Sequence, residues 1–102
     1  MAFETIIKDG IAELVFNKPP VNAFDSLEWA SIAQVISELG VDNKVNVIVI
    51  RAEGRGFCAG VDIKELAADS SKIVAVNKGN YDTFEAIHRN PKPVIVACMV
   101  LF

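Results

Sequence analysis

The residues best suited to chemistry lie together in one short loop, residues 54–63, which follows an apolar run. The loop reads Gly-Arg-Gly-Phe-Cys-Ala-Gly-Val-Asp-Ile. Its glycines allow backbone conformations that other residues rarely adopt, and Asp62 is placed to cap a helix that begins just after it. A turn of this kind presents backbone N–H groups, which can bind an anion or polarise a carbonyl group.

A nucleotide-binding loop is the main alternative for this stretch. Gly54, Gly56 and Gly60 are spaced loosely like the glycines of a dinucleotide-binding loop. In that fold the glycines open a helix directly, whereas Phe57 and Val61 here stand where the close approach of a pyrophosphate requires small residues. A P-loop is excluded because no Gly-Lys-Ser/Thr sequence follows. The dinucleotide reading is therefore the weaker of the two.

The other reactive side chains predict less. Cys58 has no histidine near it in the sequence, so we expect a packing residue rather than a nucleophile. His88 is the only histidine, and Cys58 and Cys98 are the only cysteines, which argues against a metal site and a disulfide framework. Glu65 is expected to be a solvated or helix-capping acid, with a catalytic role as the less favoured alternative.

Composition narrows the function classes further. The chain has 102 residues, enough for one small domain, and 52% of them are hydrophobic, which excludes disorder. No apolar run reaches the roughly 18 residues that span a bilayer, and the N-terminus lacks a signal-peptide pattern, so we expect a cytoplasmic protein without a membrane partner. The net charge is −3 with acids and bases interspersed, which argues against a nucleic-acid partner.

The first elements of the chain can be predicted from turn signals. Residues 3–8 and 11–16 are β-prone runs separated by Asp9-Gly10, which predicts a hairpin with a two-residue turn. Two prolines then end the second strand. A capping-box pattern with Asp25 as N-cap predicts a helix whose apolar residues recur at i, i+3, i+4 and i+7. Gly40 is expected to end this helix in a left-handed conformation.

The second half predicts a parallel unit around the loop. Residues 45–50 do not alternate, which predicts a strand buried on both faces. Asp62 and Glu65 repeat the capping-box pattern and predict a helix over 62–68. A third helix is predicted over 72–89, weakened by Gly79, with a buried stripe of Ile73, Val76, Tyr81, Phe84 and Ile87. Residues 94–101 predict another buried strand, parallel to the previous one because a right-handed helical crossover joins them.

Taken in order, these pieces resemble the enoyl-CoA hydratase/isomerase (crotonase) family. The resemblance covers nearly all of residues 3–97, and its most specific element is the sequence Phe-Cys-Ala-Gly-Val-Asp-Ile after a buried strand. The other matching segments are 17–23, the helix that begins near residue 26, 47–50 and 92–97. The resemblance implies an α/β fold, the N-terminal half of a crotonase-like ββα spiral, in which a β-hairpin precedes a βαβ unit with parallel buried strands.

The resemblance also implies a substrate and a set of site residues. Members of the family bind acyl-CoA thioesters and stabilise an enolate-like oxyanion with two backbone N–H groups. The first of these N–H groups corresponds to that of Val61. The positions along the adenine and pantetheine path correspond to Ala59, Gly60, Asp62 and Ile63, and those of the opposite wall correspond to Lys18 and Ala23. No cofactor is implied except coenzyme A as part of the substrate.

Cationic side chains are candidates for the CoA phosphates. Lys18, Arg55 and Lys64 all lie in or beside the matching segments, although any one of them can equally be a solvated surface charge. The sequence of the loop, together with the Lys-Glu that follows it, is similar to that of a subgroup of the family that acts on bulky, sterol-derived CoA esters.

The sequence departs from the family pattern after Ala97. A second glycine-rich turn would be expected there, followed by the acid and base positions, but the chain reads Cys-Met-Val-Leu-Phe. We therefore expect residues 1–102 to form a partial domain, truncated before that turn and before the trimerisation region. Such a chain is expected to be inactive alone, because each general acid or base contributes a factor of roughly 100 to 10,000.

The departure leaves two functional hypotheses. The first is a fragment of an enoyl-CoA hydratase-like enzyme, a lyase or isomerase of fatty acid metabolism whose reaction this part of the sequence does not define. The alternative is a non-catalytic truncated product, at most a weak CoA-binding or association module. In either case we expect homo-oligomers that form through exposed apolar surface.

Overall fold

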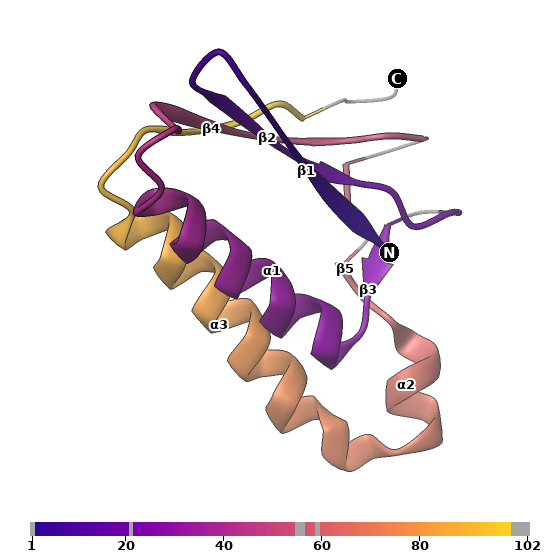
Figure 1. Cartoon of the computed structure of the whole chain (residues 1–102). Helices are drawn as coiled ribbons and strands as arrows, with labels where there is room; N and C mark the ends of the chain where they lie inside the picture. Colours follow the sequence, from indigo (N-terminus) through magenta and orange to yellow (C-terminus); the bar gives the residue numbers. More distant parts are fainter. Residues whose placement is uncertain (1, 21, 55–56, 59, 99–102) are drawn as a thin grey trace.

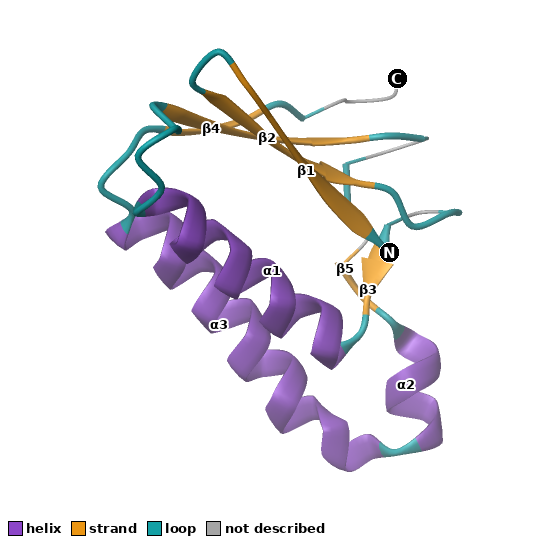
Figure 2. Cartoon of the chain, viewed as in Figure 1, coloured by secondary structure: helices purple, strands orange, loops and turns teal. Residues whose placement is uncertain are grey.

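The computed structural model describes residues 2–20, 22–54, 57–58 and 60–98. Its main sheet has the strand order β1-β2-β4-β6, and two long helices cover one face of it (Figures 1 and 2). The strands of this sheet are β1 (Phe3–Lys8), β2 (Ile11–Phe16), β4 (Val47–Ala52) and β6 (Val94–Val96), and the helices are α1 (Ser26–Gly40) and α3 (Ile73–Arg89).

Three smaller elements lie beside this sheet. The strands β3 (Ala23–Phe24) and β5 (Gly60–Val61) form a separate two-stranded pair. A short helix, α2 (Ile63–Ala68), follows β5 and leads through a single 3₁₀ turn, η1 (Ser70–Lys72), into α3. The predicted helix over 62–68 and the break after it are therefore confirmed.

The N-terminal hairpin is confirmed in detail. β1 and β2 are antiparallel and Lys8 pairs with Ile11, which leaves only Asp9 and Gly10 in the turn. Both turn residues have positive φ, 54° and 80°, as a type I′ turn requires. A Cβ on Gly10 would also lie 2.5 Å from the side chain of Asn46. Glycine is therefore needed here both for its conformation and for the close contact with the next strand.

The predicted parallel unit is also present. β2 pairs with β4, and β4 pairs with β6, both in parallel register. The fold is therefore the expected α/β arrangement, in which a hairpin is followed by strands joined through helices that lie on one face of the sheet. Because β2 and β4 are parallel, the residues that follow β4, which include the glycine loop, lie at the same end of the sheet as the residues that follow β2.

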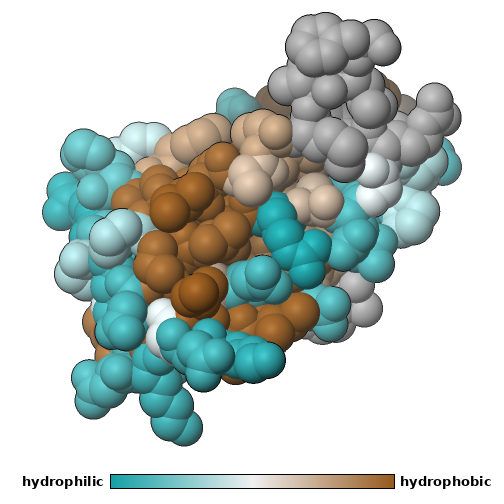
Figure 3. All heavy atoms as spheres, turned by 90° about the horizontal axis from the view of Figure 1, so that it is seen from above, coloured by the Kyte–Doolittle hydropathy of each residue, from teal (hydrophilic) through white to brown (hydrophobic). Residues whose placement is uncertain are grey.

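The expectation that β4 is buried on both faces is wrong. Ile48 and Ile50 face the helices and are buried, whereas Val47 and Val49 on the opposite face are only half-buried. The two long helices cover a single face of the sheet, so an uninterrupted apolar strand keeps one partly exposed side (Figure 3). Seen from that side, apolar side chains gather over the sheet.

The last strand is shorter and less buried than predicted. β6 comprises only Val94–Val96 rather than residues 94–101, of which 99–101 lie outside the described residues. It is the last strand in the order of the sheet, and Ile95 and Val96 are 54% and 43% exposed. An apolar run at the edge of a sheet is not covered from the side, which explains the difference.

The start of α1 is confirmed, and its end is different from the prediction. Asp25 accepts a hydrogen bond from Glu28 N at 2.8 Å, and Glu28 Oε1 accepts one from Asp25 N at 2.9 Å, which completes the capping box. Gly40 is still inside the helix rather than in a left-handed cap. A Cβ there would lie 2.9 Å from the amide of Asn90, so glycine serves a close contact with the end of α3.

The predicted buried stripe of α3 is only partly correct. Val76 is buried and Ile87 is half-buried, but Ile73, Tyr81 and Phe84 are 43%, 67% and 68% exposed. The residues that face α1 are small ones: Gly79 and Thr83 are buried. Close approach of the two helices therefore replaces the large apolar contacts that the periodicity predicts.

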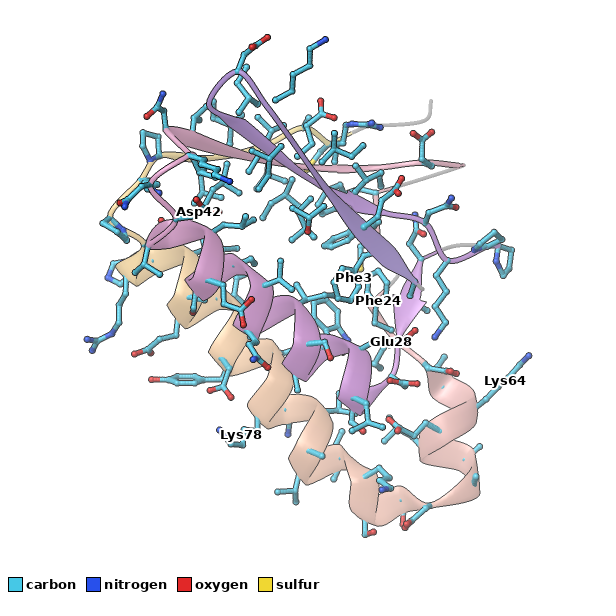
Figure 4. All side chains as sticks on the ribbon, viewed as in Figure 1. Phe3, Phe24, Glu28, Asp42, Lys64 and Lys78 are labelled. Carbon is cyan, nitrogen blue, oxygen red and sulfur yellow. The ribbon has the colours of Figure 1, made fainter. Side chains whose placement is uncertain are left out.

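A cluster of aromatic rings links the core to the glycine loop. The ring of Phe24 meets those of Phe16 and Trp29 edge to face, with centroids 4.9 and 5.4 Å apart. Phe57, within the loop, lies 5.4 Å from Phe16. Figure 4 shows Phe24 and Phe3 between the sheet and the start of α1. The loop is thus anchored to the core beside β3. None of the helices in the described part of the chain is long and apolar enough to cross a membrane.

Candidate functional site

The end of the glycine loop is held by a small parallel pair that sequence patterns did not predict. In this pair Ala23 lies opposite Gly60, and Phe24 lies opposite Val61. Asp62 N donates a hydrogen bond of 2.9 Å to Phe24 O, which continues the pairing by one residue. Strands of two residues have no detectable periodicity, so only the tertiary structure reveals that the segment before α1 supports the loop.

This pairing sets the direction of the Val61 N–H. Successive N–H groups along an extended strand point to opposite edges, and Asp62 N–H points toward β3. The Val61 N–H therefore points away from β3, where the described residues provide no further strand beside β5. Gly60 has φ of 102°, and a Cβ on it would meet nothing within 4 Å. The Val61 N–H thus faces the side of β5 on which no other described strand lies, and its neighbour Gly60 has no side chain.

Asp62 caps α2 as expected, but the second capping box is absent. Asp62 Oδ1 accepts a hydrogen bond of 2.9 Å from Lys64 N. Glu65, predicted to complete the box, instead reaches the first residue of α1. Its two carboxylate oxygens accept from Ser26 N and Ser26 Oγ, both at 2.9 Å. The donors at the start of α1 therefore take the carboxylate that the local pattern assigned to α2.

Lys18 lies between the N-terminus of α1 and the N-terminus of α2. Its Nζ is 2.5 Å from Glu28 Oε1 and 3.7 Å from Asp62 Oδ2. Partial burial opposes the charge of Lys18, but its hydrogen bond and attraction to Glu28, with smaller contributions from Asp25 and Asp62, outweigh this effect and raise its pKa. The ammonium is therefore engaged with carboxylates of the protein, which weakens its candidacy as a contact for CoA phosphates.

Asn22 is a residue of the site whose role sequence analysis missed. Its side chain is 3% exposed, and Nδ2 donates to Glu53 O at 3.1 Å and to Phe57 O at 3.3 Å. Its Oδ1 accepts from Lys18 N at 2.6 Å. The residue also has a positive φ of 57°, which asparagine tolerates better than most residues. The asparagine shortly after two prolines was the sequence signal available for this turn. The Asn22 side chain binds both ends of the loop segment 53–57.

Five of the seven predicted site residues line one groove. Its volume is about 350 Å³, and its walls come from the segment before β3 and from the turn between β5 and α2. The lining residues are Lys18, Pro19, Pro20, Ala23, Val61, Asp62, Ile63 and Lys64. Lys64, at the start of α2, extends away from the body of the protein (Figure 4). Of the two remaining predicted residues, Gly60 lies beside this groove in β5, and Ala59 lies outside the described residues.

A second, largely apolar cavity is lined in part by Gly60. It has a volume of about 310 Å³ and lies between β2, the loop and α3. Its lining residues include Gly60, Phe57, Cys58, Trp29, Phe84 and Val96. Burial raises the pKa of the Cys58 thiol, although a hydrogen bond from Gly60 N to its Sγ, at 3.4 Å, opposes this effect. A thiol kept neutral fits the expected packing role.

The remaining chemical candidates lie apart from the groove. His88 is exposed in the last turn of α3. Within the described ranges, no three side chains of histidine, cysteine, aspartate or glutamate are arranged to hold a metal ion. A further cavity of about 540 Å³ lies between α1 and α3, and none of the predicted site residues lines it.

Known proteins share both the sequence and the fold of this chain. The sequence profile described as enoyl-CoA hydratase/isomerase matches residues 6–99. A (7aS)-7a-methyl-1,5-dioxo-2,3,5,6,7,7a-hexahydro-1H-indene-carboxyl-CoA hydrolase of Rhodococcus jostii is 41% identical over 87% of this chain and 35% of its own length. The protein of the same name from Mycobacterium tuberculosis is 36% identical over 91% of this chain and 38% of its own length.

The structural comparison agrees with the sequence comparison. A crystal structure of an enoyl-CoA hydratase from Mycobacterium marinum superimposes with a TM-score of 0.82 at 25% identity, over 96% of this chain and 48% of that one. The chain thus spans less than two fifths of the length of the two curated relatives above.

Proposed function

The chain belongs to the enoyl-CoA hydratase/isomerase family, and we propose that its groove binds an acyl-CoA thioester whose carbonyl oxygen accepts a hydrogen bond from Val61 N–H. The observation that carries this proposal is the pairing of β3 with β5. The alternation of N–H groups along β5 then directs the Val61 N–H away from β3; Val61 lines the groove, and its neighbour Gly60 lines the apolar cavity.

The chemistry follows from where charge develops on a thioester. Its carbonyl oxygen becomes negative when an α-proton leaves or when a nucleophile adds at Cβ. A fixed N–H dipole stabilises that charge without having to reorganise, and the loss of one such donor typically costs about 3 to 4 kcal/mol of transition-state stabilisation. Gly60 places no side chain of its own beside the Val61 N–H, and the apolar cavity that Gly60 lines supports a site of low dielectric constant.

The groove itself suits the extended part of the ligand. Ala23 and Ile63 offer apolar contacts for a pantetheine chain, and Lys64 offers a cation for a phosphate at the outer end. Lys18 takes a structural part in this proposal, because its ammonium is paired with Glu28 and Asp62. Asp62 caps α2 and so connects that helix to residues 60–62, which we call the donor turn because they include Val61 N–H.

The acyl group and the reaction are also proposals. The names of the Rhodococcus and Mycobacterium relatives describe hydrolases of a bicyclic carboxyl-CoA, so we propose a CoA ester with a bulky cyclic acyl group as the substrate class. One backbone donor without an acid and base pair polarises a thioester but completes no hydration or hydrolysis. We therefore expect residues 1–102 alone to bind acyl-CoA weakly and to turn it over negligibly.

A pair of ligands that differ only in the carbonyl group tests the proposal. Butyryl-CoA carries a thioester carbonyl, whereas S-butyl-CoA is a thioether of similar size without one. In titrations of the ¹⁵N-labelled chain, we expect both ligands to shift the amide signals of Ala23 and Ile63. We expect only butyryl-CoA to shift the amide proton of Val61 strongly downfield. Equal shifts of the Val61 signal by the two ligands, or no response to either, would overturn the proposal.

A kinetic assay tests the expectation that residues 1–102 alone turn over acyl-CoA negligibly. Crotonyl-CoA hydration by residues 1–102 should not exceed the rate with a heat-denatured control. Robust turnover by the intact chain would show that the acid and base are present within these residues, and the binding-only assignment would then be withdrawn.

A further inference from the structure

The first residue of α1, Ser26, is hydrogen-bonded to Glu65 in the first turn of α2. Glu65 Oε1 accepts from Ser26 N, and Glu65 Oε2 accepts from Ser26 Oγ, each at 2.9 Å. The two residues are 39 positions apart in the sequence. Ser26 is 6% exposed. A single carboxylate of α2 therefore takes both polar donors of the first residue of α1.

The start of α1 explains why this bond forms. The first N–H groups of a helix have no partner within it and carry a partial positive charge. The capping side chain of Asp25 already serves the N–H of Glu28, so it leaves the N–H of Ser26 without an acceptor from the cap. An ionised carboxylate offers two acceptor oxygens at the favourable end of the helix dipole, and Glu65 is the residue that provides them.

The same bond acts on the donor turn. On one side the turn is held by the two-residue pairing of β5 with β3 and by Asp62 N–H on Phe24 O. On the other side it continues into α2, whose first turn contains Glu65. The contact with Ser26 therefore fixes the far side of the turn against the same helix that follows β3. Val61 lies between these two attachments.

We propose that Glu65 is a positioning residue, which docks α2 on the N-terminus of α1 through Ser26 and thereby holds the Val61 N–H in its direction. This inference rests on the proposed function, because it assigns a role to Glu65 in the same site. It differs from an acid or base role for Glu65, because both carboxylate oxygens are occupied by Ser26 rather than directed at the groove, whose lining does not include Glu65.

Two conservative variants separate position from charge. Glu65→Gln keeps the length of the side chain, and its amide can still accept from Ser26 N while donating to Ser26 Oγ. Glu65→Asp keeps the charge but is one methylene shorter and cannot reach both donors. Glu38→Gln is the matched control, since Glu38 is an exposed residue of α1 whose carboxylate accepts a hydrogen bond from Gln34 Nε2 at 3.0 Å, on the same helix.

The first measurement needs no ligand. Amide hydrogen exchange of Asp62, whose N–H is bonded to Phe24 O, reports whether the donor turn stays docked. Under conditions where all variants are folded, we expect Glu65→Asp to accelerate exchange at Asp62 about tenfold, as the net loss of one hydrogen bond implies. Glu65→Gln should change it less than threefold, and Glu38→Gln should not change it. Unaltered protection of Asp62 in Glu65→Asp would overturn the proposal.

The second measurement reads the donor itself. The carbonyl stretching frequency of bound butyryl-CoA falls when a hydrogen bond polarises the thioester. At saturating ligand we expect Glu65→Asp to lose most of this shift and Glu65→Gln to keep most of it. A lower thermal stability with an unchanged carbonyl frequency would make Glu65 a structural residue only, and would overturn the proposal. Loss of the shift in Glu65→Gln but not in Glu65→Asp would assign the role to its charge instead.

The two measurements also keep this inference distinct from the proposed function. If the unaltered chain binds neither ligand, the acyl-CoA proposal fails. The exchange of Asp62 then still decides whether Glu65 holds the turn.

Discussion

Polar side chains around the glycine loop act mainly on one another and on the backbone. Asn22 holds the loop at Glu53 O and Phe57 O, and Asp62 caps α2. Lys18 is engaged by Glu28 and Asp62. Lys18 and Asp62, which the sequence offered as candidates for ligand contact, thus serve to shape the backbone. In the proposed function, the group that faces the ligand is a main-chain N–H. This division suits a site in which a fixed dipole does the chemistry.

The contribution of Asn22 can be measured by substitution. Asn22→Ala removes the side-chain bonds to two loop carbonyls and places a Cβ-bearing residue without a compensating bond at φ of 57°. We expect the free energy of unfolding in urea to fall by about 2 to 4 kcal/mol. Asn22→Gly loses the same bonds without the conformational cost, so it should be about 1 kcal/mol more stable than Asn22→Ala. A change below about 0.5 kcal/mol in Asn22→Ala would contradict this account.

At the scale of elements, the packing of α3 on α1 depends on a small residue. A Cβ on Gly79 would lie 2.7 Å from the Cβ of Trp29 and 3.3 Å from Ala30 N. Thr83, one turn later, donates to Trp29 O at 3.2 Å and to Gly79 O at 2.8 Å. The two helices therefore meet backbone to backbone at this point. Glycine is a poor helix former, but at position 79 it permits the contact that holds α3 in place.

Gly79→Ala tests this contact. Alanine favours an isolated helix by about 1 kcal/mol over glycine, but here it must push α3 away from Trp29. We expect a net destabilisation of about 1 to 3 kcal/mol, measured by thermal and urea unfolding. Asn77→Ala, at an exposed position of the same helix, is the control and should be neutral or slightly stabilising. A rise in melting temperature for Gly79→Ala would show that the helices have room to spare.

The element scale also shows where sequence reasoning succeeded. The type I′ hairpin, the capping box at Asp25, the start of α2 and the parallel strands are all local or pattern-based signals, and all are present. The stripe of α3 was predicted only partly correctly, and the role of Gly40 and the second capping box were predicted wrongly. In each case the residue interacts with an element distant in sequence, namely Trp29, Asn90 or Ser26.

At the scale of the molecule, the described part of the sheet has one face that the helices do not cover and two edge strands, β1 and β6. The helices pack on a single side, and apolar side chains lie exposed on the other (Figure 3). Ile6 on β1, Ile11 on β2 and Ile95 on β6 are 41%, 44% and 54% exposed. Among the described residues β6 has a neighbouring strand on one side only. Such a surface favours association, and we propose that copies of the chain associate through it.

This association should depend on β6. In sedimentation velocity experiments at increasing protein concentration, we expect the unaltered chain to shift toward larger species. Ile95→Lys, which places a charge on the open edge strand, should reduce that shift. Leu27→Lys is the matched control, because Leu27 is 77% exposed on α1, away from the sheet. A chain that stays monomeric throughout the series, or equal effects of the two substitutions, would contradict this proposal.

By itself, the sequence determined the family and the order of the elements, and it identified the glycine loop as the candidate site. These follow from turn residues, capping patterns and apolar runs, which act over a few neighbouring positions. The tertiary structure alone decided that β3 pairs with β5, that Asn22 bonds to both ends of segment 53–57, that Glu65 bonds to Ser26, and that Lys18 is paired with carboxylates of the protein. Those contacts join residues far apart in the sequence, such as Ser26 and Glu65, which are 39 positions apart. Their partners are chosen by packing and by unsatisfied helix ends, which no local pattern records.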